Sequence, residues 1–116
     1  MKEANEGLRR HKLMTESIKK QIPKLYQTEE TPHEDKTVYV KYFSPYSGWS
    51  WYVVEFDGVD MCFGLVKGFE VEYGYFSLTE LAEVTVFNGV PAIERDLSFT
   101  PKPLKEIEEM LRAGVA

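Results

Sequence analysis

The sequence lacks the features of an exported, membrane-bound or disulfide-stabilised protein. It contains a single cysteine, Cys62, among 116 residues, so no internal disulfide can form. No stretch approaches the roughly 18 unbroken apolar residues that a membrane-spanning helix needs. The N-terminus, MKEANEGLRRHKLM, also lacks the apolar run of a signal peptide. We therefore expect a cytoplasmic protein without a membrane partner.

Positive charge is scarce in most of the chain. Residues 1–36 carry eight Lys and Arg against seven Asp and Glu, whereas residues 37–116 carry six against twelve, and the whole chain has a net charge of −5. Phosphate backbones are bound mainly by Lys and Arg, so we do not expect a nucleic-acid partner. A solvated acidic surface, a surface that mimics DNA and a basic protein partner all remain open.

No residue pattern specifies a catalytic or metal-binding chemistry. His11 and His33 lie in polar N-terminal segments without a Cys or carboxylate at ligand spacing, so no metal site or cofactor is predicted. No Ser lies in a nucleophile elbow, and the glycines do not form a phosphate-binding loop. Cys62 lies in the apolar run Met61–Val66 and is interpreted as a small buried hydrophobic residue.

The residues that are present predict an α+β domain. The composition is 43% hydrophobic and 14% aromatic, which is typical of a globular protein with many aromatic residues. We predict a charged, frayed or partly helical extension over 1–13 and a single domain over 14–116. A helix is predicted to begin at the N-cap Thr15 and to end near Pro23. A final helix near 103–112 carries an apolar stripe of Leu104, Ile107 and Leu111.

Between these helices the pattern is that of extended chain. Four runs rich in Val, Tyr and Phe are separated by short turns and predict an antiparallel meander: Thr37–Ser44, Trp49–Phe56, Asp60–Lys67 and Val71–Phe76. A capping box, Ser77-Leu78-Thr79-Glu80, predicts a short helix after the fourth strand. Further extended segments flank Asn88-Gly89 and continue over Ala92–Phe99. We thus predict a β-meander of about five to six strands with an N-terminal helix, a short capped helix and a C-terminal helix that packs on the sheet.

Both faces of the predicted sheet are apolar. Side chains alternate along a strand, so Val38, Val40 and Tyr42 are predicted to share one face of the first strand. On the second strand, one face takes Tyr52, Val54 and Phe56, and the other takes Trp49, Trp51 and Val53. A sheet with one solvated face alternates apolar and polar residues, so something must cover the second face. The cover is either the protein's own helices or an outside partner.

The partner interpretation singles out a group of aromatic residues. Trp and Tyr are frequent binding anchors, and they cluster around the loop Ser44–Gly48. Arg95 is the one cation in a long acidic stretch, where it could bind an anion or form a local ion pair. The candidate partner-binding residues are Tyr39, Phe43, Tyr46, Trp49, Trp51 and Arg95.

Two other classes of function remain open. A small enzyme could use carboxylates as metal ligands or acid–base groups, namely Glu55, Asp57, Asp60 and Glu72. Such residues at strand ends are also typical of solvated charge. Alternatively, aromatic side chains could stack on single-stranded bases. Lys41 is the only basic residue in the first two strands, however, so the positive surface that such binding needs is missing.

Several segments resemble a family of small bacterial and phage proteins catalogued only as a domain of unknown function. The resemblance covers roughly residues 14–107. It rests on Leu25-Tyr26, Trp49-x-Trp51-Tyr52, Gly74-Tyr75-Phe76-Ser77-Leu78 and Glu94-Arg95-Asp96. It implies a context on plasmids, conjugative elements and phages, and it supplies no activity, cofactor or catalytic residue. We therefore expect a non-catalytic accessory protein of a mobile genetic element that binds a protein partner, with its oligomeric state left open.

Overall fold

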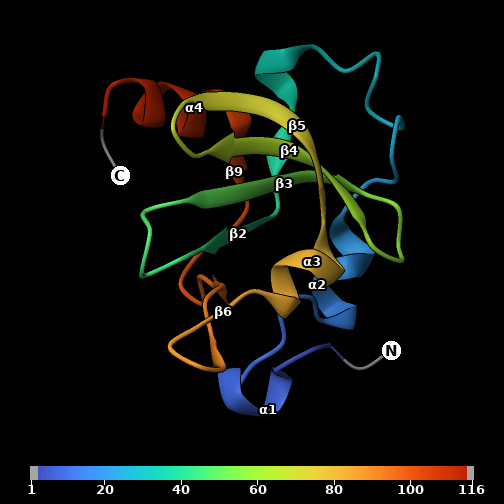
Figure 1. Ribbon diagram of the computed structural model, residues 1–116. Coiled ribbons are helices and arrows are strands. Elements are labelled where there is room, and N and C mark those ends of the chain that lie inside the picture. The colour runs from blue at the N-terminus through green and yellow to red at the C-terminus, as the bar shows by residue number, and fades with distance from the viewer. Residues whose placement is uncertain (1–2, 115–116) are drawn as a thin grey trace.

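An antiparallel sheet with helices on both sides forms the centre of the molecule in a computed structural model that describes residues 3–114 (Figure 1). The α+β class is confirmed. The helices are α1 Glu6–Arg9, α2 Glu16–Gln21, α3 Leu78–Glu83 and α4 Leu104–Arg112, with a short 3-10 helix η1 at His33–Asp35. The strands are β1 Thr37–Val38, β2 Val40–Phe43, β3 Ser50–Phe56, β4 Met61–Lys67, β5 Val71–Ser77, β6 Thr85–Val86, β7 Val90–Pro91, β8 Glu94–Arg95 and β9 Lys102–Pro103.

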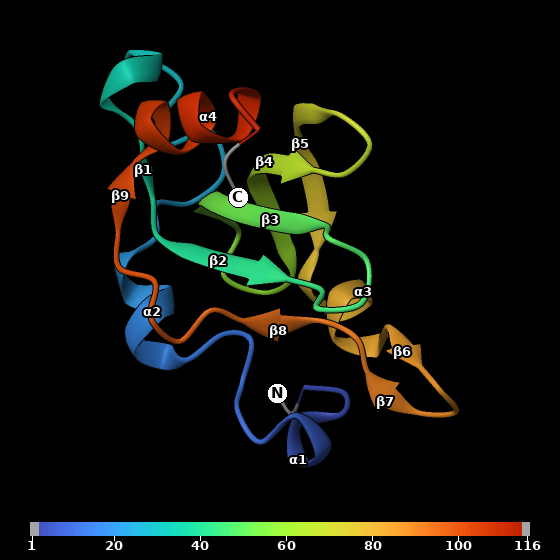
Figure 2. The same ribbon diagram turned by 90° about the vertical axis from the view of Figure 1, so that its left-hand side faces the viewer.

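The main sheet has five strands in the order β5-β4-β3-β2-β8. Strands β2 to β5 form the predicted meander, and β8 pairs with the other side of β2 (Figure 2). Of the extended run predicted over Ala92–Phe99, only Glu94–Arg95 is a strand. Two short ribbons complete the topology: β1 pairs with β9, and β6 pairs with β7 around the turn at Asn88-Gly89.

Helices α2 and α3 begin where their capping residues predict. Thr15 Oγ1 accepts a hydrogen bond of 3.1 Å from the backbone N–H of Ile18, and Ser77 Oγ accepts one of 3.1 Å from that of Glu80. Each bond satisfies an amide that has no partner inside its helix. α2 ends at Gln21, and its C-cap Ile22 is extended because it precedes Pro23. No helix within residues 3–114 combines the length and the apolar character needed to cross a membrane.

The predicted alternation fails at two positions. The first strand is interrupted at Tyr39, so Val38 lies in the core beneath α4, whereas Val40 and Tyr42 lie in the core on the opposite face. The register of β3 shifts between Val53 and Glu55, opposite Gly64 and Phe63 of β4. Such a bulge moves every later side chain to the other face.

The bulge explains where Phe56 and Gly64 lie. Phe56 joins Val53 in one core instead of sharing a face with Tyr52 and Val54. At Gly64 the strands approach so closely that a Cβ atom would collide with the carbonyl oxygen of Tyr52. A glycine is therefore required at this position.

The chain covers the centre of both sheet faces itself. Beneath α4 lie Val38, Tyr52, Val54, Leu65, Leu104, Ile107 and Leu111. On the opposite face lie Leu13, Ile22, Val40, Tyr42, Val53, Phe56, Cys62, Leu78, Leu81, Ala82 and Ile93. Burying a Val, Leu, Ile or Phe side chain stabilises the folded state by about 1.5–3 kcal/mol. Cys62 is fully buried, as predicted, and burial raises the pKa of its thiol.

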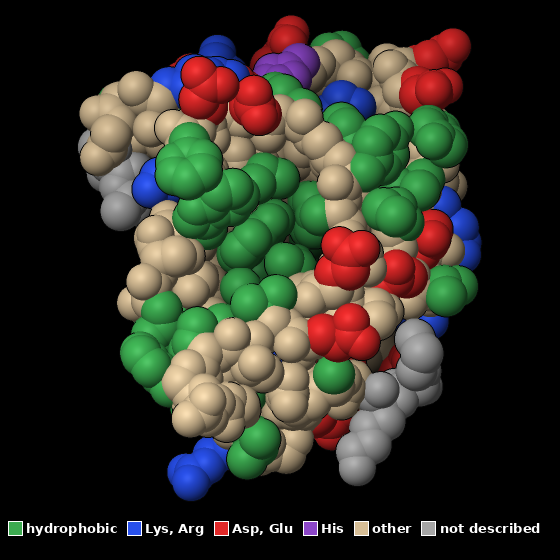
Figure 3. Space-filling view, in the orientation of Figure 1, with side chains coloured by type: hydrophobic (Ala, Val, Ile, Leu, Met, Phe, Trp, Pro, Cys, Tyr) green, Lys and Arg blue, Asp and Glu red, His purple; other side chains and the backbone are tan. Residues whose placement is uncertain are grey.

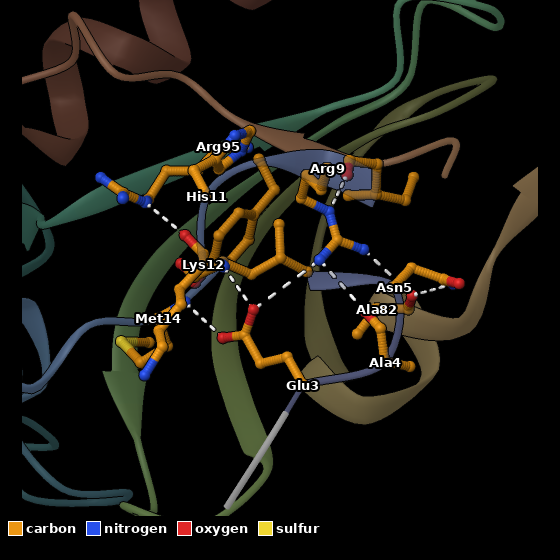
Figure 4. Close-up of polar contacts among 12 residues, drawn as sticks. Glu3, Ala4, Asn5, Arg9, His11, Lys12, Met14, Ala82 and Arg95 are labelled. Carbon is orange, nitrogen blue, oxygen red and sulfur yellow. Dashed lines mark hydrogen bonds and ion pairs between the residues drawn. The ribbon is translucent and has the colours of Figure 1, made fainter. Parts of the chain in front are cut away.

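The described part of the N-terminal segment packs against the sheet and contains α1, in agreement with the partly helical alternative predicted for residues 1–13. Arg9 is buried and donates hydrogen bonds to the backbone carbonyls of Ile93 (2.8 Å), Ala82 (3.0 Å) and Ala4 (3.2 Å) (Figure 4). The carboxylate of Glu3 accepts from the amides of Leu13 (2.6 Å) and Met14 (2.7 Å). Burial lowers the pKa of Arg9, and Glu3, at 3.7 Å, opposes that shift.

Candidate partner-binding surface

The structure brings Trp49 and Trp51 together and adds Phe69 to them. The two indole centroids lie 6.0 Å apart, and the ring of Phe69 meets Trp49 edge-on at 5.5 Å. Phe69 is 96% exposed, while both tryptophans are half-buried. We call Trp49, Trp51, Val66 and Phe69 the tryptophan surface. In the space-filling view, hydrophobic side chains gather in a hollow over the main sheet, with Asp and Glu side chains above it and to its right (Figure 3).

Two turns position the tryptophan surface. The β2–β3 loop is closed by the amide of Ser44, which donates to the carbonyl of Trp49 at 2.9 Å. The β4–β5 turn is closed by the amide of Gly68, which donates to the carbonyl of Glu70 at 2.9 Å. A Cβ atom at Gly68 would lie 2.5 Å from Cη2 of Trp49, so the indole packs directly on the glycine backbone.

An open hollow of about 500 Å³ adjoins these rings. Trp49, Val66 and Phe69 supply its apolar lining, and Glu70 and Glu72 supply carboxylates. Sequence reasoning missed Phe69 because it lies outside the strands. The available signal was a large apolar residue in a tight turn, where no core contact requires one.

The other predicted aromatic residues lie apart from this group. Tyr46 packs edge-on against Phe87 at 5.4 Å, and both rings are exposed. Tyr39 is half-buried against the core opposite α4. Phe43 faces the other side of the sheet from Trp51, because Trp51 pairs with Tyr42, the neighbour of Phe43 on β2.

Arg95 binds the N-terminal segment. Its Nε donates to the carbonyl of Lys12 at 2.9 Å, and its amide donates to Nε2 of His11 at 3.1 Å (Figure 4). Burial, followed by the positive charge of Arg95, lowers the pKa of His11. These contacts join β8 to the segment that precedes Leu13.

Three of the four candidate catalytic carboxylates bind backbone amides. Glu55 is buried and accepts from the amides of Tyr26 (2.8 Å) and Thr28 (3.1 Å) and from the hydroxyl of Thr28. Oδ1 of Asp57 accepts hydrogen bonds from the backbone amides of Val59, Asp60 and Met61, in the turn between β3 and β4. These bonds hold loops in place.

Asp60 has a similar role at the start of α3. It accepts from Ser77 Oγ (2.7 Å) and from the amide of Thr79 (2.6 Å). Burial raises the pKa values of Asp57 and Asp60, but these hydrogen bonds outweigh burial and lower both. In the described part of the chain, no three His, Cys, Asp or Glu side chains gather in a way that could hold a metal ion.

A polar cluster that the sequence did not reveal lies at the edge of α4. Oε1 of Glu108 accepts from the hydroxyl of Tyr73 at 2.6 Å and lies 2.7 Å from Nε2 of His33. Arg112 donates to Oε2 of Glu108 at 2.9 Å. Burial opposes ionisation of Glu108, but the bonds from Tyr73, His33 and Arg112 outweigh it and lower its pKa to about 2. The cluster joins η1, β5 and α4.

The chain belongs to a family described as protein of unknown function (DUF2958), whose model matches residues 13–113. No curated protein and no solved structure matches the chain. The family assignment covers the main sheet, both cores and the tryptophan surface. It begins at Leu13, so the segment that contains Arg9 precedes the matched region.

Proposed function

We propose that this chain is a non-catalytic interaction module that binds a protein partner through the tryptophan surface. The observation that carries the proposal is the exposure of Phe69, a large apolar ring that is 96% accessible yet packed against Trp49. A solvated aromatic ring gains free energy when a partner buries it, and Trp is enriched among the residues that dominate binding energy. Tyr46 and Phe87 form a second exposed aromatic pair, apart from the tryptophan surface, and we include this pair in the proposed interface.

The uses of the carboxylates support a binding role over an enzymatic one. Glu55, Asp57 and Asp60 are engaged with backbone amides, so their lone pairs are directed to structural contacts. Glu72 adjoins the hollow with Glu70. Negative charge there disfavours single-stranded nucleic acid, whose phosphates would be repelled.

The proposal extends to the setting in which the module acts. The resemblance described above implies plasmids, conjugative elements and phages, and we place this chain among the cytoplasmic accessory proteins of such an element. The net charge of −5 favours a partner with a basic surface.

Photo-crosslinking from position 69 tests the proposal. A photoreactive phenylalanine analogue replaces Phe69 in the full chain, expressed in a bacterial host that carries the element. The crosslinked protein is identified, purified and titrated against the unmodified chain. We expect Phe69→Ala to weaken binding about tenfold or more, as loss of an aromatic anchor does.

The matched control places the same analogue at Met110, which is also partly exposed but lies on α4. We expect no crosslink to the same partner from that position. An identical set of crosslinked proteins from both positions, or a purified partner that binds Phe69→Ala with unchanged affinity, would contradict the proposal.

A further inference from the structure

The outer edge of β5 is a long strand with one neighbour. β5 spans seven residues at the end of the sheet order and pairs with β4. Figure 2 shows it as the outermost strand on its side of the sheet. The opposite end of the sheet is β8, which has two residues. An edge strand presents backbone N–H and C=O groups that another strand can pair with.

β5 has few of the features that usually block such pairing, and Glu72 is its one charged residue. Its sequence, Val71-Glu72-Tyr73-Gly74-Tyr75-Phe76-Ser77, contains no Lys and no Pro. Its register with β4 runs without a shift from Val71 to Ser77, in contrast to the bulge in β3. Natural sheets protect their edges with Lys, Pro, bulges or short strands. A regular seven-residue edge is therefore available for strand addition.

A row of aromatic rings follows this edge on the face that α4 partly covers. Neighbouring rings in the row lie 5.0 to 6.4 Å apart between centroids. The row consists of Tyr26, Tyr75, Phe63, Tyr73 and His33. We call it the tyrosine stripe. Tyr26 is 59% exposed, Tyr75 53% and Tyr73 37%. The tyrosine stripe lies on the opposite face of the sheet from Trp51. Trp51 and Glu72 both pair with Val66 and share its face, whereas Tyr73 pairs with Leu65 on the other face.

The charge around the edge is negative. Glu70 and Glu72 lie at one end of β5, with Glu72 on the face of Trp51, and the carboxylate of Glu108 accepts from Tyr73 on the face of the tyrosine stripe. The pKa of Tyr75 is raised, mainly by a hydrogen bond with Tyr26. The negative charges of Glu55 and Glu29 raise it further. Aromatic faces attract cations, and Arg stacks on them with particular ease. The combination of rings and carboxylates complements a basic ligand.

We infer that β5 accepts an extended, Arg- or Lys-rich segment of a protein partner as a sixth strand of the main sheet, with basic side chains on the tyrosine stripe. Charge selects this occupant over a second copy, because each copy carries a net charge of −5 and two Glu residues at this edge. The inference goes beyond the proposed function, since it concerns another face and other residues.

Three synthetic heptapeptides test the inference on the full chain. The first is Val-Arg-Val-Arg-Val-Arg-Val with both ends blocked. The second replaces Arg by citrulline, which keeps the shape and removes the charge. The third keeps Arg but carries N-methyl groups on alternate amides along one edge, which blocks strand pairing. Fluorescence anisotropy at moderate salt measures their affinities.

We expect the Arg peptide to bind about tenfold or more tightly than either control, since charge and backbone pairing both contribute. Hydrogen exchange should slow at the amides of residues 71–77 when the Arg peptide binds. Tyr75→Ala should weaken binding about fivefold or more through loss of the ring. Tyr46→Ala is the matched control, because its ring is similarly exposed outside the stripe, and it should leave the affinity unchanged.

Equal binding of the Arg and citrulline peptides, or of the N-methylated peptide, would overturn the inference. So would a dimer of the chain alone in which β5 amides are protected, since a second copy would then occupy the edge. Phe69→Ala should leave peptide binding unchanged. Failure at β5 therefore leaves the tryptophan surface standing, and failure of the crosslinking experiment leaves the β5 inference standing.

Discussion

The two faces of the main sheet are covered in different ways. On one face, α4 presents a regular apolar stripe of Leu104, Ile107 and Leu111 to the strands. On the other, irregular segments and the short helices α1, α2 and α3 form the cover, and one side chain in that cover is the charged Arg9. The core beneath α4 is built from apolar side chains. The second face also depends on the hydrogen bonds that a buried charge, Arg9, makes to backbone carbonyls.

The two covers should respond to different kinds of substitution. A buried guanidinium costs several kcal/mol in lost hydration, and well-placed acceptors offset that cost. Three backbone carbonyls and Glu3 do so for Arg9. Truncation of the apolar residues beneath α4 should therefore act through loss of volume, and truncation of Arg9 through loss of a hydrogen-bonding group.

The largest effect is expected from Leu104→Ala. Leu104 is fully buried beneath α4, and its truncation leaves a cavity that the surrounding side chains fill only in part. We expect the free energy of unfolding to fall by about 3 kcal/mol, measured by urea denaturation at 25 °C. Met110→Ala is the control on the same helix, and a loss below about 1 kcal/mol is expected because Met110 is partly exposed. Equal losses would mean that α4 does not pack as described.

The next effect is expected from Arg9→Ala. The substitution leaves the buried carbonyls of Ala82 and Ile93 without their side-chain donor. We expect a loss of about 2 kcal/mol, because unsatisfied buried polar groups keep their desolvation cost. Arg10→Ala serves as the control, since Arg10 is exposed. If both variants unfold at the wild-type urea concentration, the N-terminal segment contributes no stability and the contrast between the two faces disappears.

Local patterns predicted much of the fold. The caps at Thr15 and Ser77 and the stripe on α4 involve residues a few positions apart, so the sequence contains all the information they need. The meander follows from short turns between apolar runs. The bulge after Val53 was not predicted, because a register shift depends on the partner strand and on how closely Gly64 lets it approach.

Contacts between distant residues account for what the sequence did not reveal. Arg9 binds carbonyls 73 and 84 positions away, and His33 meets Glu108 across 75 positions. No periodicity encodes such pairs. At the candidate site, Trp49 and Trp51 were identified from residue type, and the structure brings them together. Phe69 was missed because only the folded β4–β5 turn places it on Trp49.

A smaller effect is expected from Glu55→Gln, which tests a polar contact on the α4 side of the molecule. In the variant an NH2 group, which can only donate, replaces one carboxylate oxygen and faces the donor amide of either Tyr26 or Thr28. We expect a loss of about 1–2 kcal/mol. Hydrogen exchange should accelerate at the amides of Tyr26 and Thr28, and Glu29→Gln, an exposed neighbour in the loop, is the control. Unchanged exchange at both amides would contradict the anchoring role of Glu55.

The smallest effect, and the most specific in its pH dependence, is expected from Glu108→Gln. The ordinary pKa of this group is 4.5, and its partners Tyr73, His33 and Arg112 lower it to about 2. A carboxyl whose pKa falls on folding stabilises the folded state above its unfolded value and loses that contribution as the pH falls through its folded value. At pH 7 the free energy of unfolding of the wild type should exceed that of Glu108→Gln by about 1 kcal/mol. The difference is small because solvent screens this partly exposed cluster. The difference should shrink between pH 4.5 and pH 2. Glu109→Gln is the control, because Glu109 is exposed on the same helix, and it should show no such pH dependence. Parallel profiles of unfolding free energy against pH for the wild type and Glu108→Gln would refute the assigned role of the cluster.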